Sequence, residues 1–225
     1  MINITKAQKI PQSLAIEKAK PSSTNYRAVD VVEQIHTDFH NKCYLCEYYA
    51  PTTINVEHFV PHRGNRDLMF DWANLFYVCG HCNSQKGDNF DNILNCTDDS
   101  HKILDWIRFS INPYPKEKVD IQCENNSTHV QNTVELLLRV YNGENTGLKT
   151  AEGENIRERL IEEMVKFTKR LHKYFKQTIA EKDKNRYRQK IGEMLSPKSP
   201  FTAFKVWVIK ENHVLFNEFG KYLST

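Results

Sequence analysis

Apolar residues recur every three or four positions in three parts of the chain, and this spacing predicts helices. In residues 28–39 the apolar positions are Val29, Val32, Ile35 and Phe39. A second helical face consists of Val134, Leu137, Leu138 and Tyr141. The longest predicted helix covers residues 152–182, with Ile156, Leu160, Met164, Phe167, Leu171, Phe175 and Ile179 on its apolar face. The apolar and aromatic stretch 201–222 is expected to pack back on the body of the protein.

A different pattern separates the first helix from the later ones. Pro51 and Pro61 exclude a long helix there, and the short apolar runs 54–56 and 75–78 predict two strands. Residues 79–86 suit a short helix that ends at the following glycine. The predicted fold class is therefore α+β and mostly helical, with a small module of two strands and a helix before a helical C-terminal region.

These patterns divide the chain into three parts. Residues 1–27 are predicted to form a polar N-terminal arm, residues 28–95 the small module and residues 96–225 the helical region. With 40% hydrophobic residues among 225, the chain can bury a core. It has no run of about 20 apolar residues that could cross a bilayer, and its N-terminus lacks the apolar stretch of a secretion signal. We therefore expect a cytoplasmic protein without a membrane partner, in a compartment where structural disulfides are rare.

Two Cys-x-x-Cys pairs lie toward the two ends of the small module. The first is Cys43-Tyr-Leu-Cys46 and the second is Cys79-Gly-His-Cys82. Four thiolates from two such pairs can form the tetrahedron of a structural Zn²⁺ site, and redox-active dithiols are the alternative interpretation. Two pairs in one chain favour the metal site.

The other sulfur and imidazole groups nearby receive no ligand role. Cys96 and Cys123 have no partner at metal-binding spacing, so they are interpreted as ordinary thiols. His81 could replace a cysteine, but four thiolates already complete the shell. We therefore expect His81 to face solvent.

Glu57, His58 and Asn83 carry the candidate chemistry. Hydrolysis of a phosphodiester needs an activated water and a cation beside the phosphate. The imidazole can accept a proton from water near neutral pH, and the carboxylate and amide oxygens suit Mg²⁺ or Mn²⁺. Because neighbouring residues of a strand point to opposite faces, Glu57 and His58 can share one site only at an irregular strand end. An isolated histidine at position 58 would be interpreted as an ordinary one.

Three motifs follow one another within residues 43–88. They are Glu57-His58-Phe59-Val60-Pro61, Asp71-Trp72-Ala73-Asn74-Leu75 and Cys79-Gly80-His81-Cys82-Asn83-Ser84-Gln85-Lys86-Gly87-Asp88. With them the chain resembles the HNH endonucleases, which implies a ββα-metal module. The resemblance implies that His58 is the general base and that Glu57 and Asn83 bind one divalent ion. It also implies that Asn74 orients the active loop through hydrogen bonds. Many members of this family carry aspartate where this chain has Glu57.

The same motifs are similar to those of one subgroup, the HNH nuclease subunits of Septu-type anti-phage systems and of related retron effectors. This narrower resemblance implies a role in antiviral defence, with an ABC/SMC-like ATPase as partner. In a retron system, a reverse transcriptase and its RNA–DNA product would join the assembly. A helical region after the HNH module also fits the subgroup.

Positive charge is concentrated in the C-terminal half. The whole chain has a net charge of +3, whereas residues 166–190 contain ten Lys or Arg and two acidic residues, a net charge of +8. Such a stretch could follow a phosphate backbone, form a solvated helix face or meet an acidic partner. Lys169, Arg170 and Lys173 are the candidate nucleic-acid contacts in it. Lys86 could also contact a phosphate, or be a solvated lysine at a helix end.

The leading hypothesis is a metal-dependent endonuclease that hydrolyses phosphodiester bonds in nucleic acid, with DNA favoured and RNA also compatible. The alternative is a non-catalytic zinc-containing module that binds nucleic acid or a protein partner. The alternative accounts for the cysteines and the basic stretch. It gives no reason for the catalytic-type residues, which are Glu57, His58, Asn74 and Asn83, to occur together.

Overall fold

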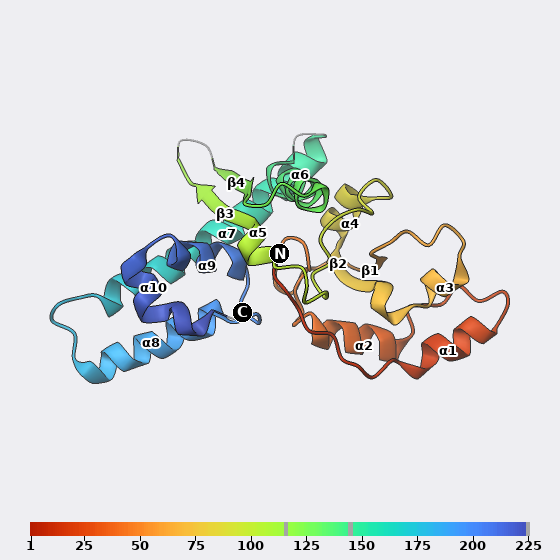
Figure 1. Cartoon of the computed structure of the whole chain (residues 1–225), viewed down its shortest axis with the longest axis horizontal. Coiled ribbons are helices and arrows are strands. Elements are labelled where there is room, and N and C mark those ends of the chain that lie inside the picture. The colour runs from red at the N-terminus through yellow and green to blue at the C-terminus, as the bar shows by residue number, and fades with distance from the viewer. Residues whose placement is uncertain (115–116, 144–145, 224–225) are drawn as a thin grey trace.

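The computed structural model describes residues 1–114, 117–143 and 146–223 and shows an elongated molecule (Figure 1). One end contains α1 (Gln12–Ala19), α2 (Val29–Asp38), β1 (Ile54–His58), α3 (Arg66–Met69), the 3₁₀ helix η1 (Trp72–Asn74), β2 (Leu75–Cys79) and α4 (Gly80–Lys86). The middle contains α5 (Ile103–Trp106), β3 (Ile107–Asn112), β4 (Lys118–Cys123) and α6 (Thr128–Asn142). The other end is formed by α7 (Gly147–Tyr174), α8 (Glu181–Leu195), α9 (Thr202–Lys210), α10 (His213–Phe219) and the 3₁₀ helix η2 (Gly220–Tyr222).

Two clusters of buried apolar side chains form the interior. The larger cluster extends from the N-terminal residues through β2 and α6 to Phe204 at the start of α9. The smaller cluster lies between the last four α-helices and consists of Phe167, Leu171, Tyr174, Ile191, Met194, Leu195, Val206, Ile209 and Phe219. Phe201 and Phe204 belong to the larger cluster, so the stretch 201–222 packs back on the body as predicted.

β1, β2 and α4 form the predicted unit of two strands and a helix. The strands pair antiparallel, with Ile54 opposite Cys79 and His58 opposite Leu75. All five residues of β2 are buried, and α4 follows the strand directly and contacts both strands. Gly87 ends α4 with a φ of 49°, a left-handed conformation that glycine adopts without a Cβ penalty. The predicted α+β fold class is confirmed.

The helix predicted for residues 28–39 is present as α2, but a different face of it is buried. Val31, Ile35 and Phe39 are fully buried, whereas Val29 is 73% exposed and Val32 is 37% exposed. Both faces have apolar residues at helical spacing, and the contacts of α2 with α1 and β2 decide between them.

The single long helix predicted for residues 152–182 is wrong. The chain forms α7 up to Tyr174 and begins α8 at Glu181, and the two helices pack against each other. The apolar spacing continues through the turn between them, where Phe175 is 44% exposed. Turning back lets α8 bury its apolar face, which includes Ile191 and Leu195, on α7, an advantage that helical periodicity does not reveal.

The N-terminal segment is not a polar arm. Met1, Ile2 and Ile4 are buried in the larger core, and the Ile4 N–H donates to the Cys96 carbonyl at 2.8 Å. An extended segment can dock a few apolar residues on a core without any helical or strand periodicity, so no pattern in residues 1–27 predicts this contact. The β3–β4 hairpin was also missed, because residues 96–225 were expected to be helical.

None of the helices within the described ranges has the length and apolar character needed to cross a membrane.

Candidate functional site

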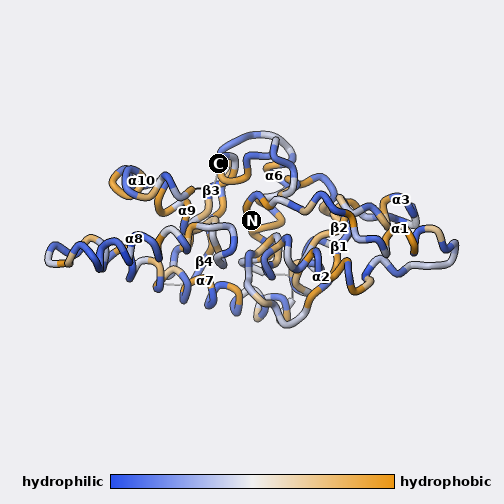
Figure 2. The backbone as a smooth tube through the Cα atoms, turned by 90° about the horizontal axis from the view of Figure 1, so that it is seen from below, coloured by the Kyte–Doolittle hydropathy of each residue, from blue (hydrophilic) through white to orange (hydrophobic). Residues whose placement is uncertain are grey.

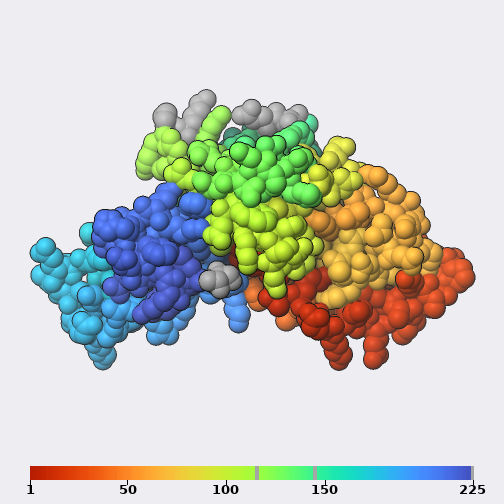
Figure 3. All heavy atoms as spheres, viewed as in Figure 1, coloured from red at the N-terminus to blue at the C-terminus, as the bar shows by residue number. Residues whose placement is uncertain are grey.

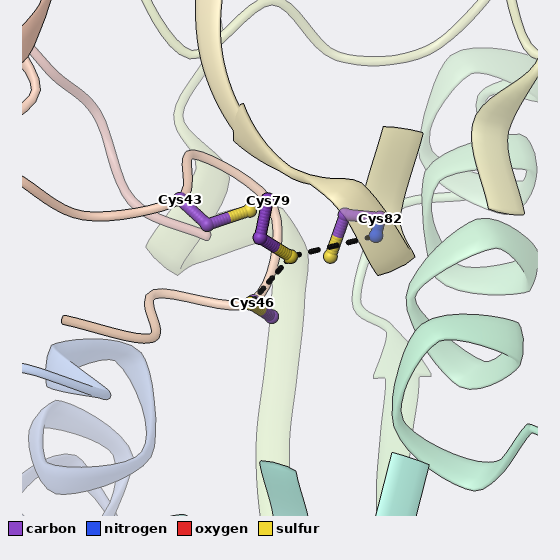
Figure 4. Close-up of side chains that lie close together, drawn as sticks. All are labelled: Cys43, Cys46, Cys79 and Cys82. Carbon is purple, nitrogen blue, oxygen red and sulfur yellow. Dashed lines mark hydrogen bonds between the residues drawn. The ribbon is translucent and has the colours of Figure 1, made fainter. Parts of the chain in front are cut away.

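The four cysteines of the two Cys-x-x-Cys pairs meet in the interior. Cys43 and Cys46 come from the turn after α2, Cys79 ends β2, and Cys82 lies in the first turn of α4. All four are buried, their sulfurs lie within 4.8 Å of one another, and their side chains converge (Figure 4). Zn–S bonds of about 2.3 Å place the sulfurs of a tetrahedron roughly 3.8 Å apart. The Cys46 and Cys79 sulfurs are 3.9 Å apart, so the cluster has the geometry to hold a metal ion such as zinc.

His81 does not face solvent as we expected. It is buried, with Nε2 at 2.8 Å from the Val140 carbonyl and Nδ1 at 2.8 Å from the Glu152 carboxylate. These contacts join α4 to α6 and α7. The expectation was wrong because the helical region packs directly against the second Cys-x-x-Cys turn, a contact between segments that are distant in the sequence.

A cavity of about 520 Å³ lies beside β1 and α4. Glu57, His58 and Asn83, which the sequence places up to 26 positions apart, all line it. His58 is the last residue of β1, so the strand ends where both neighbouring side chains reach the same cavity. The cavity is therefore lined by one candidate base and two candidate oxygen ligands.

The imidazole of His58 is oriented by the backbone. Its Nε2 lies 3.0 Å from the Met69 carbonyl. Because a carbonyl oxygen only accepts hydrogen bonds, Nε2 carries the proton and Nδ1 is the basic nitrogen. The rings of Tyr26 and His62 pack edgewise against His58, with centroids 4.4 and 4.6 Å away. Burial lowers the pKa of His58, which favours the neutral imidazole that a general base requires.

Glu57 is buried with one of its oxygens unpartnered. Its Oε1 lies 2.8 Å from Nζ of Lys86 and 3.5 Å from the Tyr44 hydroxyl. Its Oε2 has no hydrogen-bond partner in the described structure. Burial raises the pKa of Glu57 to about 7, although Lys86 favours the ionised form. A buried carboxylate oxygen without a partner is where a cation would be stabilising.

Lys86 is neither a solvated lysine nor an exposed phosphate contact. Its side chain is only 1% exposed, and Nζ also lies 3.4 Å from the His58 carbonyl. Both earlier interpretations treated Lys86 as a residue at the end of an isolated helix. In the fold, α4 lies on the strands, and this brings the Lys86 ammonium to the buried Glu57.

Asn74 fixes the loop that follows β1. Its side-chain oxygen accepts from the Val60 N–H at 2.7 Å, and its amide donates to the carbonyls of Val60 and Leu68 at 2.9 and 3.0 Å. The residue is buried and does not line the cavity. This is the orienting role that the HNH resemblance implies for Asn74.

Among the residues of the cavity wall that were assigned no site role from the sequence are four with rings or positive charge. Tyr26 and Arg27 belong to the N-terminal segment, and the Arg27 guanidinium lies 4.8 Å from the centre of the Tyr26 ring. His62 and Arg63 follow β1, close to the Glu57-His58 motif, where the sequence is compatible with facing substrate and favours a solvated surface. No spacing rule links positions 26 and 27 to position 58, so only the fold could place them there. For Arg63, closeness to the motif was the available signal.

The candidate nucleic-acid contacts of the basic stretch lie far from this cavity. Figure 3 shows the surface around residues 170–190 at the end of the molecule opposite α1 and α3. Lys169 and Lys173 are exposed on α7. Arg170 is half-buried instead, with Nη1 3.2 Å from the Met194 sulfur of α8. Because Arg170 lies between the two helices, it is not one of the exposed charges that could contact nucleic acid.

No protein-family model matches this chain, and no curated protein matches it in sequence.

Proposed function

We propose that this chain is a metal-dependent endonuclease of the HNH type and that the cavity beside β1 and α4 is its active site. The observation that carries the proposal is that His58, Glu57 and Asn83 line one cavity, where His58 has a basic nitrogen and Glu57 an unpartnered carboxylate oxygen. Zinc in the cysteine cluster would hold the start of the module to the turn between β2 and α4.

The donor set fits a hard divalent ion such as Mg²⁺ or Mn²⁺. Glu57 offers the unpartnered carboxylate oxygen and Asn83 a neutral amide oxygen, and both suit such an ion. When bound, the ion would neutralise charge on the phosphate and on the departing oxygen.

The protein groups have separate tasks in this proposal. Nδ1 of His58 takes a proton from the attacking water, while the Met69 carbonyl holds the ring in that tautomer. Lys86 holds one oxygen of Glu57 and leaves the other for the ion. Arg27, exposed at the rim, can contact a phosphate. Because the site would bind a phosphate backbone, it is compatible with DNA or RNA.

The defence role stays a prediction from the resemblance. It would place this nuclease in an anti-phage complex with an ABC/SMC-like ATPase and, in a retron system, with a reverse transcriptase and its RNA–DNA product. Co-purification with the product of a neighbouring ATPase gene would test this part separately from catalysis.

The decisive experiment is a cleavage assay with Mg²⁺ or Mn²⁺ on supercoiled plasmid, single-stranded DNA and total RNA. The wild type is compared with His58→Ala and with His172→Ala, a matched control at an exposed histidine of α7. We expect cleavage by the wild type and the control, and a loss of about 100-fold or more in His58→Ala. Zinc content is measured in all three, so that a lost cluster is not mistaken for a lost base.

Two other outcomes would contradict the proposal. Equal cleavage by His58→Ala would remove His58 as the base and suggest a contaminating nuclease. Absence of cleavage by the wild type, alone and with a co-purified ATPase partner, would favour the alternative of a zinc-containing binding module.

A further inference from the structure

Residues 166–190 are strongly basic although the chain as a whole is not. They carry a net charge of +8 in a chain whose net charge is +3, so the remaining residues carry a net charge of −5. Figure 2 shows α8 as a mostly hydrophilic trace at one end of the molecule. The positive potential is therefore confined to one end instead of being a general property of the protein.

The fold gathers part of this charge into one surface across α7 and α8. Lys166, Lys169 and Lys173 follow one another at three- and four-residue spacing and form one stripe on α7. Nζ of Lys173 lies 5.7 Å from the ring centre of Tyr187 on α8, and the Arg186 guanidinium lies 5.4 Å from it. Lys190 follows Tyr187 by three residues on α8. The name basic patch is used below for Lys166, Lys169, Lys173, Arg186, Tyr187 and Lys190.

Most of the charge in the basic patch is not neutralised within the protein. Across residues 1–114, 117–143 and 146–223, no carboxylate lies within 4.0 Å of the ammonium groups of Lys169, Lys173 and Lys190. Lys166 lies 3.8 Å from Glu163 and Arg186 lies 3.0 Å from Asp183, but both basic side chains are more than half exposed. Like charges one turn apart on a helix destabilise it slightly, so the arrangement does not serve the stability of α7.

We propose that the basic patch binds a single-stranded segment of nucleic acid, with phosphates on the lysines and a base on Tyr187. A partly exposed ring among exposed cations is the combination that sequence-independent single-strand binding uses. An acidic protein surface would meet the charges but would not require the ring. Binding of the strand does not depend on the proposed nuclease function. Only the inference that the bound strand is a substrate rests on it.

α7 sets the spacing between the basic patch and the cavity. Nζ of Lys149 lies 3.3 Å from the carbonyl of Ser84, the neighbour of Asn83. Lys173 follows 24 positions later in the same helix, a rise of roughly 36 Å. The basic patch would therefore hold a strand roughly 36 Å along α7 from the neighbourhood of Asn83.

The test measures binding in a full-length protein that cannot cleave. Fluorescence anisotropy is recorded in the His58→Ala background, without divalent ions, on a single-stranded DNA of about 25 nucleotides, longer than the proposed spacing. The patch variant is Lys169→Glu, Lys173→Glu and Lys190→Glu. The matched control reverses three exposed lysines outside the basic patch, Lys9, Lys198 and Lys221. Thermal melts of both variants establish that the fold is kept.

We expect the patch variant to bind about tenfold more weakly or worse, and the control to bind like the parent. The slope of log affinity against log salt should fall in magnitude by about 2, because each phosphate contact contributes about 0.7 on single strands. Equal losses in patch and control variants would overturn the proposal, because net charge alone would then explain binding. Unchanged nucleic-acid binding, with loss of an acidic protein from a pull-down, would assign the patch to a protein partner. Because this assay measures binding and not cleavage, its outcome is independent of whether the cavity beside β1 and α4 is an active site. The two proposals can therefore fail separately.

Discussion

Two buried glutamate–lysine pairs lie near the cysteine cluster, and they differ in how fully the carboxylate is satisfied. Glu47 pairs with Lys42 at 3.2 Å, and Glu57 pairs with Lys86 at 2.8 Å, with all four side chains at most 6% exposed. Glu47 also accepts from the N-terminal ammonium at 3.0 Å and from the backbone N–H groups of Thr202 and Ala203. Both of its oxygens are therefore used twice, whereas one oxygen of Glu57 has no partner.

The pKa values of the two carboxyl groups move in opposite directions. Burial would raise the pKa of Glu47, but the N-terminal ammonium, Lys42 and backbone donors bring it down to about 2. Burial raises the pKa of Glu57 to about 7 because Lys86 is its main compensation. A carboxylate with hydrogen-bond donors on both oxygens, which we call closed, is typical of a residue that holds a fold together. A carboxylate with one unpartnered oxygen, which we call open, lowers the stability of the fold and leaves that oxygen for a ligand.

Removal of metal from the cysteine cluster should have the largest effect, because both pairs depend on it. Glu47 follows Cys46 directly, and Lys86 lies in α4, the helix that also contains Cys82. We expect zinc in the purified protein, and we expect chelation to lower the free energy of unfolding by ~5 kcal/mol or more. Metal analysis and thermal melts before and after chelation measure this, with zinc added back as the control. An unchanged melting temperature after complete metal removal would show that the cluster is not a structural site.

Glu47→Gln should be the most damaging of the single substitutions for stability. The pKa of Glu47 falls from 4.5 to about 2, which corresponds to a stabilisation of about 3 kcal/mol. Urea unfolding should show a loss of this size at pH 7. Because the pKa is lowered, the stabilisation is present above pH 4.5 and disappears as the pH falls toward 2. A loss that is the same at pH 7 and at pH 3 would mean that packing, not charge, is responsible.

Glu57→Gln should change the free energy of unfolding in the opposite direction to Glu47→Gln in the same urea assay. The pKa of Glu57 is raised from 4.5 to about 7, so its ionisation weakens the fold as the pH rises through this interval. Without divalent ions, the neutral amide should leave the free energy of unfolding unchanged at pH 7.5 or raise it by up to about 3 kcal/mol. Metal-dependent cleavage should fall about 100-fold, since the proposed ion loses its charged ligand. A variant that is destabilised and retains cleavage would reverse the roles given to the two glutamates.

The sequence identified the groups of the candidate site better than it identified their surroundings. The spacing of the two Cys-x-x-Cys pairs within residues 43–82 was enough to predict that the four cysteines meet. An antiparallel strand pair followed by a helix brings the second pair back to the first. The same local logic placed Glu57, His58 and Asn83 beside one cavity.

The contacts that depend on distant segments could not be predicted. Lys86 and His81 were each interpreted from their own element, and each is positioned by another one. The break between α7 and α8 has the same origin, because the apolar spacing continues through it and only the packing of α8 requires the turn. Periodicity describes what an element can bury, and the choice of partner comes from the whole chain.

Lys86→Met should give the smallest effect and should separate the two pairs most finely. Methionine keeps much of the length of lysine and removes the ammonium that favours the ionised form of Glu57. The pKa of Glu57 should therefore rise above about 7, so that fewer molecules offer a charged ligand at neutral pH. The concentration of Mn²⁺ needed for half-maximal cleavage should increase about tenfold, and the acidic limb of the pH profile should move to higher pH.

Lys86→Arg should restore part of the wild-type behaviour. Lys42→Met makes the same change in the closed pair, where it should lower the melting temperature and leave the Mn²⁺ requirement as it was. If Lys86→Met also changes only stability, then Lys86 serves the fold alone and the difference between the two pairs has no consequence for metal binding.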